Sequence, residues 1–340
     1  MKYINKITGN PSQIFPSVQY KGDFDPSIYI GDPNGSTIKA IELEEAKNRF
    51  VYKYVVNQVE NEYTMSSLES IHHGTGNSYI EGLDNVYADV ESMEFSPYFR
   101  PTLARNAFRW MTNLKTVYNL NLHDCSDIYN AFGNPNLDTV STPEYTEGEA
   151  GVTVIRITQD SSAVNLGYTF SGGVEWTDIT IEVPNTGIDY ARGIFENCAR
   201  LETVTVDFTG ASTNGGNRYG MFKNCSSLES INGHWEDRYI NRLSDMFTGC
   251  TNLVNFNGIE GIGEGFVYNA SYPGNQYFDL SMCSKLSETS VHNIVANLGT
   301  VPTNDPAIDA KLKFASTQYG YLTADEIAAA TAKGWTIQSV

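Results

Sequence analysis

A short pattern of apolar positions recurs along the middle of the chain. It reads Phe-x-x-Cys-x-x-Leu-x-x-Val or Ile, and its clearest copies are Phe195–Val204, Phe222–Ile231 and, with Phe in the last position, Phe247–Phe256. Phe and Cys three residues apart share one face of a helical turn, and Leu continues that face. Apolar and polar residues then alternate through Val204 and Val206, which is typical of a half-buried strand. Each copy therefore predicts one helical turn followed by one short strand.

The spacing of the copies predicts a solenoid. Phe108 and Phe132 lie 24 residues apart, and Phe222 and Phe247 lie 25 apart. Self-similarity at this period is typical of coils that bury their apolar edges against their neighbours. The longer interval from Phe132 to Phe195, 63 residues, has room for one or two degenerate coils and an insertion near 141–190. Strands are expected within it at 151–157 and 179–183.

The Phe and Cys positions of the pattern are predicted to be buried rungs of the core. They are Phe108, Phe132, Phe195, Cys198, Phe222, Cys225, Phe247, Cys250 and Cys283. The cysteines number five, and four of them occupy one position in successive coils, which does not suggest a disulfide framework. Parallel Cβ vectors give poor bridge geometry. With one thiol per coil, we expect small buried apolar groups, no metal site and no cofactor.

The repeated phrase resembles the BspA-like subclass of leucine-rich repeats, whose units read roughly Ala-Phe-x-x-Cys-x-x-Leu-x-x-Ile. The resemblance covers about two thirds of the chain. It implies an α/β solenoid of leucine-rich-repeat-like coils over 61–286. Proteins of this kind occur on the surface of gut bacteria and in the virion appendages of their phages. A fragment at 66–71 repeats 226–231 letter for letter, and either a first coil or chance accounts for it.

The two ends of the chain differ from the repeat. Residues 1–60 are rich in Pro, Gly and Tyr and read as an arm with turns, a short helix at 41–49 and a strand at 50–56. This arm is either a cap for the solenoid or an anchor to another subunit. Residues 287–340 are expected to form an α/β cap, with Ser287 capping a helix over 288–297, a strand at 311–314 and a capping box at Thr323. This ending resembles the terminal module of repeat proteins from gut bacteria and their phages.

Charge and hydropathy narrow the classes of partner. A formal charge of −18 opposes binding to nucleic acid and to anionic membrane surfaces. No apolar run is long enough to span a bilayer, so we expect no membrane insertion. The first seven residues lack the apolar core of a signal peptide, so we expect a protein that is not exported.

Outward positions of the predicted strands are the natural binding surface. These candidate ligand-binding residues are Thr205, Asp207, Asn232, His234, Trp235 and Asn257. Small polar groups beside aromatic ones in register would suit a carbohydrate or a protein loop, and the alternative is a merely solvated strand face. No catalytic motif is present, so no catalytic residue is nominated and no enzyme is expected.

Together these features favour a non-enzymatic structural or adhesion protein of a phage virion, in a fibre, head or tail appendage. Its arm would contact other virion or surface proteins, its repeat surface would meet a host glycan or surface protein, and it would form a homo-oligomer. Two alternatives stay open: a secreted BspA-like adhesin of the bacterial surface, and a phage depolymerase that cleaves polysaccharide with paired carboxylates.

Overall fold

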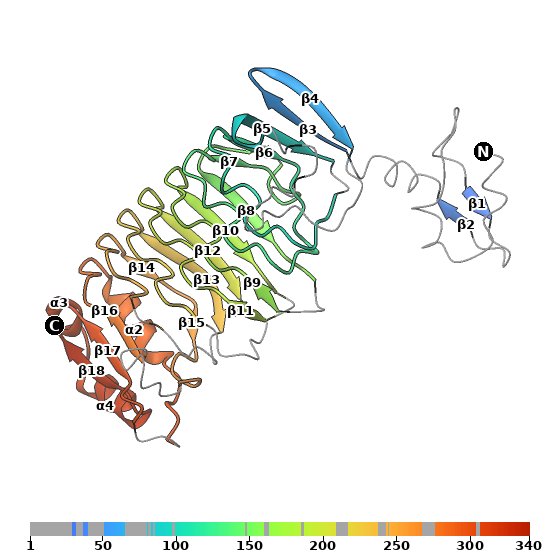
Figure 1. Cartoon of the computed structure of the whole chain (residues 1–340). Coiled ribbons are helices and arrows are strands. Elements are labelled where there is room, and N and C mark those ends of the chain that lie inside the picture. Colours follow the sequence, from blue (N-terminus) through green and yellow to red (C-terminus); the bar gives the residue numbers. More distant parts are fainter. Residues whose placement is uncertain are drawn as a thin grey trace.

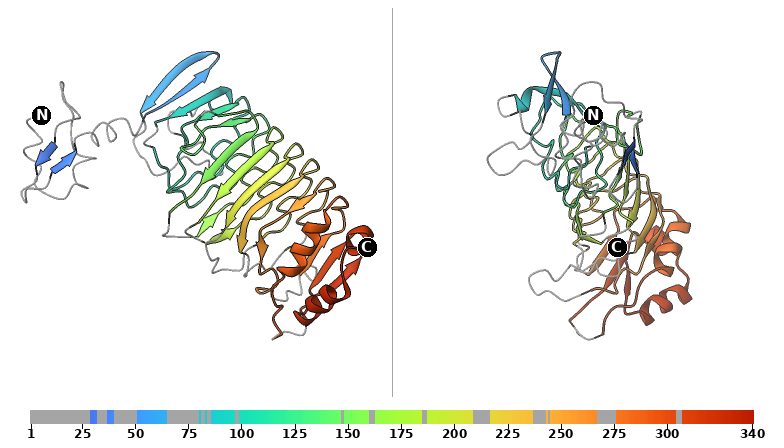
Figure 2. Two further views of the ribbon diagram at one scale, coloured as in Figure 1. Left: turned by 180° about the vertical axis from the view of Figure 1, so that it is seen from behind. Right: turned by 90° about the vertical axis from the view of Figure 1, so that its right-hand side faces the viewer.

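The computed structural model shows a mostly-β solenoid of about eight turns, built from stacked parallel strands (Figure 1). The structure describes residues 29–31, 37–39, 51–64, 80, 83, 86–96, 99–146, 148–159, 163–184, 187–208, 217–236, 243, 245–266, 276–303 and 307–340, apart from a few residues and side chains at the edges of these ranges. The predicted solenoid is therefore confirmed, and its strands run across the long axis of the body in both views of Figure 2.

One long side of the solenoid, here called the wide face, is a ladder of strands that is parallel from β5 onward and antiparallel at β3 and β4. Its first part runs in the order β4-β3-β5-β6-β7 and its second in the order β8-β10-β12-β13-β14, with β15 also paired to β13. The strands are β3 (Val51–Val56), β4 (Val59–Thr64), β5 (Val90–Phe95), β6 (Thr116–Tyr118), β7 (Thr139–Val140), β8 (Val152–Arg156), β10 (Asp178–Glu182), β12 (Thr203–Phe208), β13 (Ser230–Glu236), β14 (Asn255–Phe256) and β15 (Ile259–Glu260). The strands expected near 151–157 and 179–183 are confirmed as β8 and β10.

A second side of each coil carries a shorter parallel ladder, here called the narrow face. It consists of β9 (Val164–Asn165), β11 (Ile188–Tyr190) and single bridges from Leu103 to Asp127, Asp127 to Asn165 and Tyr190 to Asn217. The third side of the coil is the repeated phrase. Between Leu103 and Asn217 the coils thus have three sides: a wide strand, a narrow-face strand or bridge, and a run of turns.

The repeated phrase forms consecutive turns and not the helical turn that its spacing predicts. The backbone amides of Met111 and Leu114 each donate to a carbonyl three residues earlier, as in a turn. The residue two places before each Phe is in the left-handed conformation, with φ of 55° at Asn106, Asn130 and Tyr168. A left-handed residue interrupts a right-handed helix. The turn amides instead bond the next coil, as the Phe195 amide does to Met221 at 2.9 Å. The α-helices that the structure describes all follow residue 287, so the expectation of an α/β body is corrected to a mostly-β one.

The predicted rung residues line the interior of the solenoid. All nine are at most 1% exposed. Their rings form one stack, with centroid separations of 5.8 Å for Phe108–Phe132, 5.2 Å for Phe195–Phe222 and 5.4 Å for Phe222–Phe247. Phe170 completes the stack between Phe132 at 5.1 Å and Phe195 at 5.9 Å. It marks a coil within the long interval that the sequence pattern did not resolve.

The cysteines are free and buried. Burial raises the pKa of Cys198 and of Cys250 to about 12, and the pKa values of Cys225 and Cys283 also lie well above the ordinary range. Such thiols are protonated and unreactive at neutral pH. They act as packing groups of the core.

The N-terminal end of the ladder changes strand direction. The expected strand at 50–56 is confirmed as β3, which pairs antiparallel with both β4 and β5 and so covers the first coil. Strands β1 (Tyr29–Gly31) and β2 (Thr37–Lys39) form a separate antiparallel pair. The helix expected at 41–49 and the fragment at 66–71 lie outside the described residues.

The C-terminal end adds helices to a parallel sheet. Strands β16 (Tyr277–Leu280), β17 (Lys311–Phe314) and β18 (Thr336–Ser339) are joined by α2 (Glu288–Ala296), α3 (Ser316–Tyr319) and α4 (Ala324–Ala332). The predicted Ser287 cap and Thr323 capping box are both confirmed. The buried Trp335 ring lies 5.3 Å from Phe266, and its indole N–H donates to Gly299 at 3.0 Å. These contacts close the last coils.

Candidate recognition surfaces

The wide face places four of the six predicted binding residues side by side. Thr205 on β12 is the register partner of Asn232 on β13, and Asp207 is the partner of His234. The amide of Asn257 donates to Ile231 at 3.0 Å, so this residue continues the same ladder. The backbone of Trp235 pairs with that of Phe208, whereas its side chain lies outside the described part of the structure.

Strands β8 and β10 extend these rows. Thr180 joins the row of Thr205, and Glu182 joins the row of Asp207. Glu182 forms an ion pair with Arg156 on β8. Of the described outward side chains on β8, β10, β12 and β13, none carries a phenyl, phenol or indole ring. Over these four strands the wide face therefore presents polar and charged groups together with Val152 and Val154 of β8.

Charges on the wide face are unevenly placed. Burial raises the pKa of Asp178 above its ordinary value. Glu182 and Asp207 are like charges on neighbouring strands, which destabilises a sheet unless a cation lies close by. Arg156 supplies that cation for Glu182 but sits two strands away from Asp207.

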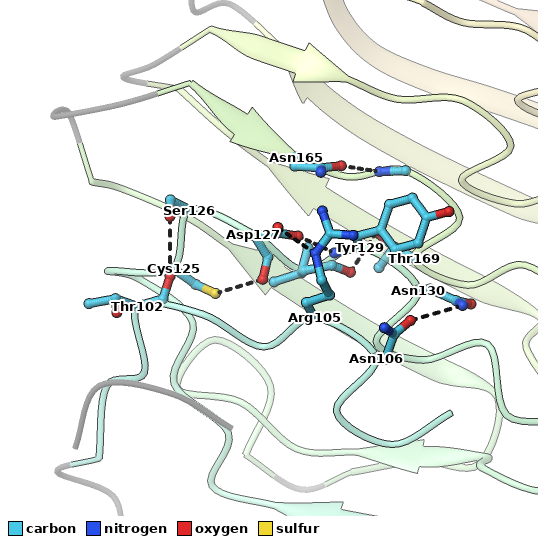
Figure 3. Close-up of polar contacts among 12 residues, drawn as sticks. Thr102, Arg105, Asn106, Cys125, Ser126, Asp127, Tyr129, Asn130, Asn165 and Thr169 are labelled. Atoms are coloured by element: carbon cyan, nitrogen blue, oxygen red, sulfur yellow. Dashed lines mark hydrogen bonds and ion pairs between the residues drawn. The ribbon is translucent and has the colours of Figure 1, made fainter. Parts of the chain in front are cut away.

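The narrow face carries a ladder of tyrosine and arginine side chains that the sequence pattern did not predict. The Arg105 guanidinium lies 4.5 Å from the ring centroid of Tyr129, and its Nε donates to Asp127 Oδ2 at 2.9 Å (Figure 3). The Tyr129 ring then meets that of Tyr168 edge-on at 5.6 Å. Arginine over an aromatic face is favourable through the ring quadrupole.

The same stacking continues through two further coils. Arg192 lies between two rings, 5.6 Å from that of Tyr168 and 4.7 Å from that of Tyr219. We call Arg105, Tyr129, Tyr168, Arg192 and Tyr219 the tyrosine–arginine ladder. Each of its members is two or three residues before a core Phe and is half-buried. An alignment of the coils on their Phe residues could have revealed this ladder. Such an alignment needs the coil at Phe170, which the repeated sequence pattern does not identify.

Burial and these contacts shift the pKa values of three residues in the ladder. A hydrogen bond to Asp245 is the largest cause that raises the pKa of Tyr219, and burial raises the pKa of Tyr168. Burial opposes the charge on Arg192, yet the neighbouring tyrosines outweigh it and the pKa of Arg192 is raised. The raised pKa values therefore keep Arg192 cationic and the phenols of Tyr168 and Tyr219 neutral near neutral pH.

A glycine makes room for two of these rings. A Cβ at Gly167 would lie 2.4 Å from Tyr190 Cδ1 and 3.0 Å from Tyr129 Cδ2. Real Cβ atoms do not approach other atoms so closely, so only glycine lets both rings occupy the space above this turn. The rings of Tyr129 and Tyr190 are 6.4 Å apart and inclined by 31°.

The described residues offer little for metal or membrane chemistry. Among them, no group of three or more His, Cys, Asp or Glu side chains is arranged to hold a metal ion. The helices within the described ranges are all too short or too polar to cross a bilayer. No protein-family model, curated protein or solved structure matches the chain.

Proposed function

We propose that this chain is a non-catalytic recognition protein of a phage particle, a structural or adhesion component of a fibre, head or tail appendage. The observation that carries the proposal is the in-register stacking of the coils. It aligns Thr180, Thr205 and Asn232 in one row of the wide face and the tyrosine–arginine ladder along the narrow face. A rigid scaffold that repeats side chains at a fixed spacing suits binding to an extended or repeating partner.

The repeated phrase also supports descent from BspA-like leucine-rich repeats. Phe, Cys and Leu occupy the interior positions that such a relationship requires. The turns in place of helices are a departure from a regular leucine-rich repeat. Under this proposal the protein belongs to the virion, its N-terminal arm docks onto other virion proteins, and several copies assemble together.

Two alternatives share the same scaffold. A secreted bacterial adhesin would use the same faces on the outside of the cell. A polysaccharide depolymerase would need paired carboxylates, and Glu182 beside Asp207 is the pair that the wide face offers. The Glu182 carboxylate is already paired with Arg156 across the sheet, which favours a binding role over a catalytic one.

Location and activity can be tested together. An antibody against the purified chain would be used for immunogold labelling of particles and of cell envelopes from a culture that expresses the gene. Label on particles is expected, and label confined to envelopes would support the adhesin instead. Release of reducing ends from capsular polysaccharide by the wild-type chain, and its loss in Asp207→Asn, would overturn the non-catalytic proposal.

A further inference from the structure

The narrow face has the chemistry of a sugar-binding surface. Two phenol rings, those of Tyr129 and Tyr190, lie over Gly167 as one broad aromatic surface. A pyranose ring presents C–H groups on its faces and hydroxyls at its rim. The ring of a half-buried tyrosine can stack on the C–H groups of the sugar, and its hydroxyl can hydrogen bond to the sugar hydroxyls. A half-buried side chain makes these contacts at little cost in conformational entropy.

Polar groups stand in register beside the rings. Asp127, Asn165 and Tyr190 occupy one row of the narrow ladder. The side-chain oxygens of Asp127 and Asn165 each accept from the backbone amide two residues on, at 2.9 Å to Tyr129 and 3.1 Å to Gly167. These bonds fix the side chains, and they leave the Asn165 amide N–H groups free for an outside acceptor.

The charges of this surface nearly cancel. Arg105 is neutralised by Asp127, and Tyr219 beside Arg192 is hydrogen-bonded to Asp245. The chain as a whole carries −18, which repels polyanions at long range. The complementary partner is thus polar, extended and uncharged.

We infer that the narrow face binds a neutral glycan chain across the Tyr129–Tyr190 surface. A sugar ring stacks on the Tyr190 phenol, because the Arg105 guanidinium already lies 4.5 Å from the centroid of the Tyr129 ring. The sugar hydroxyls meet Asp127, Asn165 and Arg105. The inference rests on the proposed recognition function and names its ligand class. It also moves the binding site from the wide face to the narrow face.

The experiment uses the full chain in affinity electrophoresis through gels that contain dextran, pullulan, mannan or galactomannan, with dextran sulfate as the anionic counterpart. Retardation by at least one neutral polysaccharide is expected. Tyr190→Ala should weaken it by about tenfold or more, and Tyr190→Phe, which keeps the ring, should retain most of it. Thr251→Ala, at an exposed turn residue outside both binding rows, is the control and should change nothing. Unfolding curves verify that each variant is folded.

Three results would overturn the inference. They are no retardation by any neutral polysaccharide, retardation by dextran sulfate alone, and equal retardation of the folded Tyr190→Ala variant. Immunogold labelling of particles would still support the proposed function in each case, so the two can fail separately.

Discussion

The thiol of Cys225 donates a hydrogen bond to the carbonyl oxygen of Phe195, one coil earlier, at 3.0 Å. The same bond joins Cys198 to Phe170 at 3.1 Å and Cys250 to Phe222 at 3.0 Å. Each thiol therefore touches the backbone of the neighbouring rung in addition to filling the core. A thiol is a weak donor, so packing supplies most of its contribution.

Burial of the thiols predicts their protection from chemical modification. Thiolate is the reactive form, and burial raises the pKa of Cys198 and Cys250 to about 12. At about pH 8 the native chain should not react with a dithio-nitrobenzoate reagent, whereas the chain in guanidinium should release colour for all five cysteines. Fast reaction of any thiol in the native chain would show that its coil opens readily.

The aromatic stack predicts a large effect of one ring. Phe222 is fully buried between Phe195 and Phe247. Phe222→Ala should lower the free energy of unfolding by about 3–5 kcal/mol, because it removes buried apolar surface and leaves a cavity. Denaturant titration followed by circular dichroism measures this loss. The exposed substitution Glu202→Ala is the control, and a loss below about 1 kcal/mol for Phe222→Ala would contradict the stack.

Two glycines with positive φ offer a matched comparison. At Gly233, φ is 109° and a Cβ would lie 1.9 Å from the Val206 carbonyl oxygen, whereas at Gly220, φ is 59° and the nearest atom is 3.7 Å away. Gly220→Ala should cost about 1–2 kcal/mol, which is the penalty of a left-handed residue with a side chain. Gly233→Ala should cost clearly more, because β13 must also move away from β12. Equal decreases in the melting temperature of the two variants would show that β13 can move away from β12 at little cost in stability.

The C-terminal sheet should weaken in acid. Burial alone would raise the pKa of Asp279, but hydrogen bonds from Ser281 and Lys313 outweigh it and hold this pKa below its ordinary value of 3.8. A lowered pKa means that the carboxylate stabilises the fold above about pH 4 and that this contribution disappears as the pH falls through the folded pKa. Thermal unfolding between about pH 2 and 6 should therefore show a steeper acid loss in the wild type than in Asp279→Asn.

A second carboxylate, that of Glu326, should also contribute to the loss of stability in acid. Backbone and side-chain hydrogen bonds of Thr323 lower the pKa of Glu326, which also contacts His292 at 2.6 Å. The double variant Asp279→Asn, Glu326→Gln should have the flattest acid profile. An acid profile in the double variant as steep as that of the wild type would assign the loss to other carboxylates.

The interior of the solenoid was largely predictable from sequence, since its positions demand particular residue types. Phe195, Cys198 and Leu201 recur because each must fill a fixed volume between coils. The coil at Phe170 escaped because Gly173 stands where Cys is expected and Trp176 stands where Leu is expected. A large indole beside a glycine fills the same space as a leucine beside a cysteine, and residue-type matching cannot detect that exchange.

The turn conformation of the repeated phrase and the tyrosine–arginine ladder on the narrow face could not be predicted from the sequence pattern. Asn106 and Asn130 tolerate the left-handed conformation, but Tyr168 adopts it too, and a tyrosine gives no such signal in a sequence. The tyrosine–arginine ladder arises from residues that are far apart in the chain and differ from coil to coil. Only the register of the narrow face brings them together.

The antiparallel hairpin at the first coil decides how copies of this protein can associate. A parallel ladder that ended on an open strand could accept the next molecule and grow into a filament. Here β3 runs against the direction of the body, and the outermost described strand of that sheet, β4, runs with it again and exposes Glu60 and Glu62. Two such edges brought together would face each other with like charges. The acidic hairpin thus opposes pairing of two copies of the chain through their β4 edges.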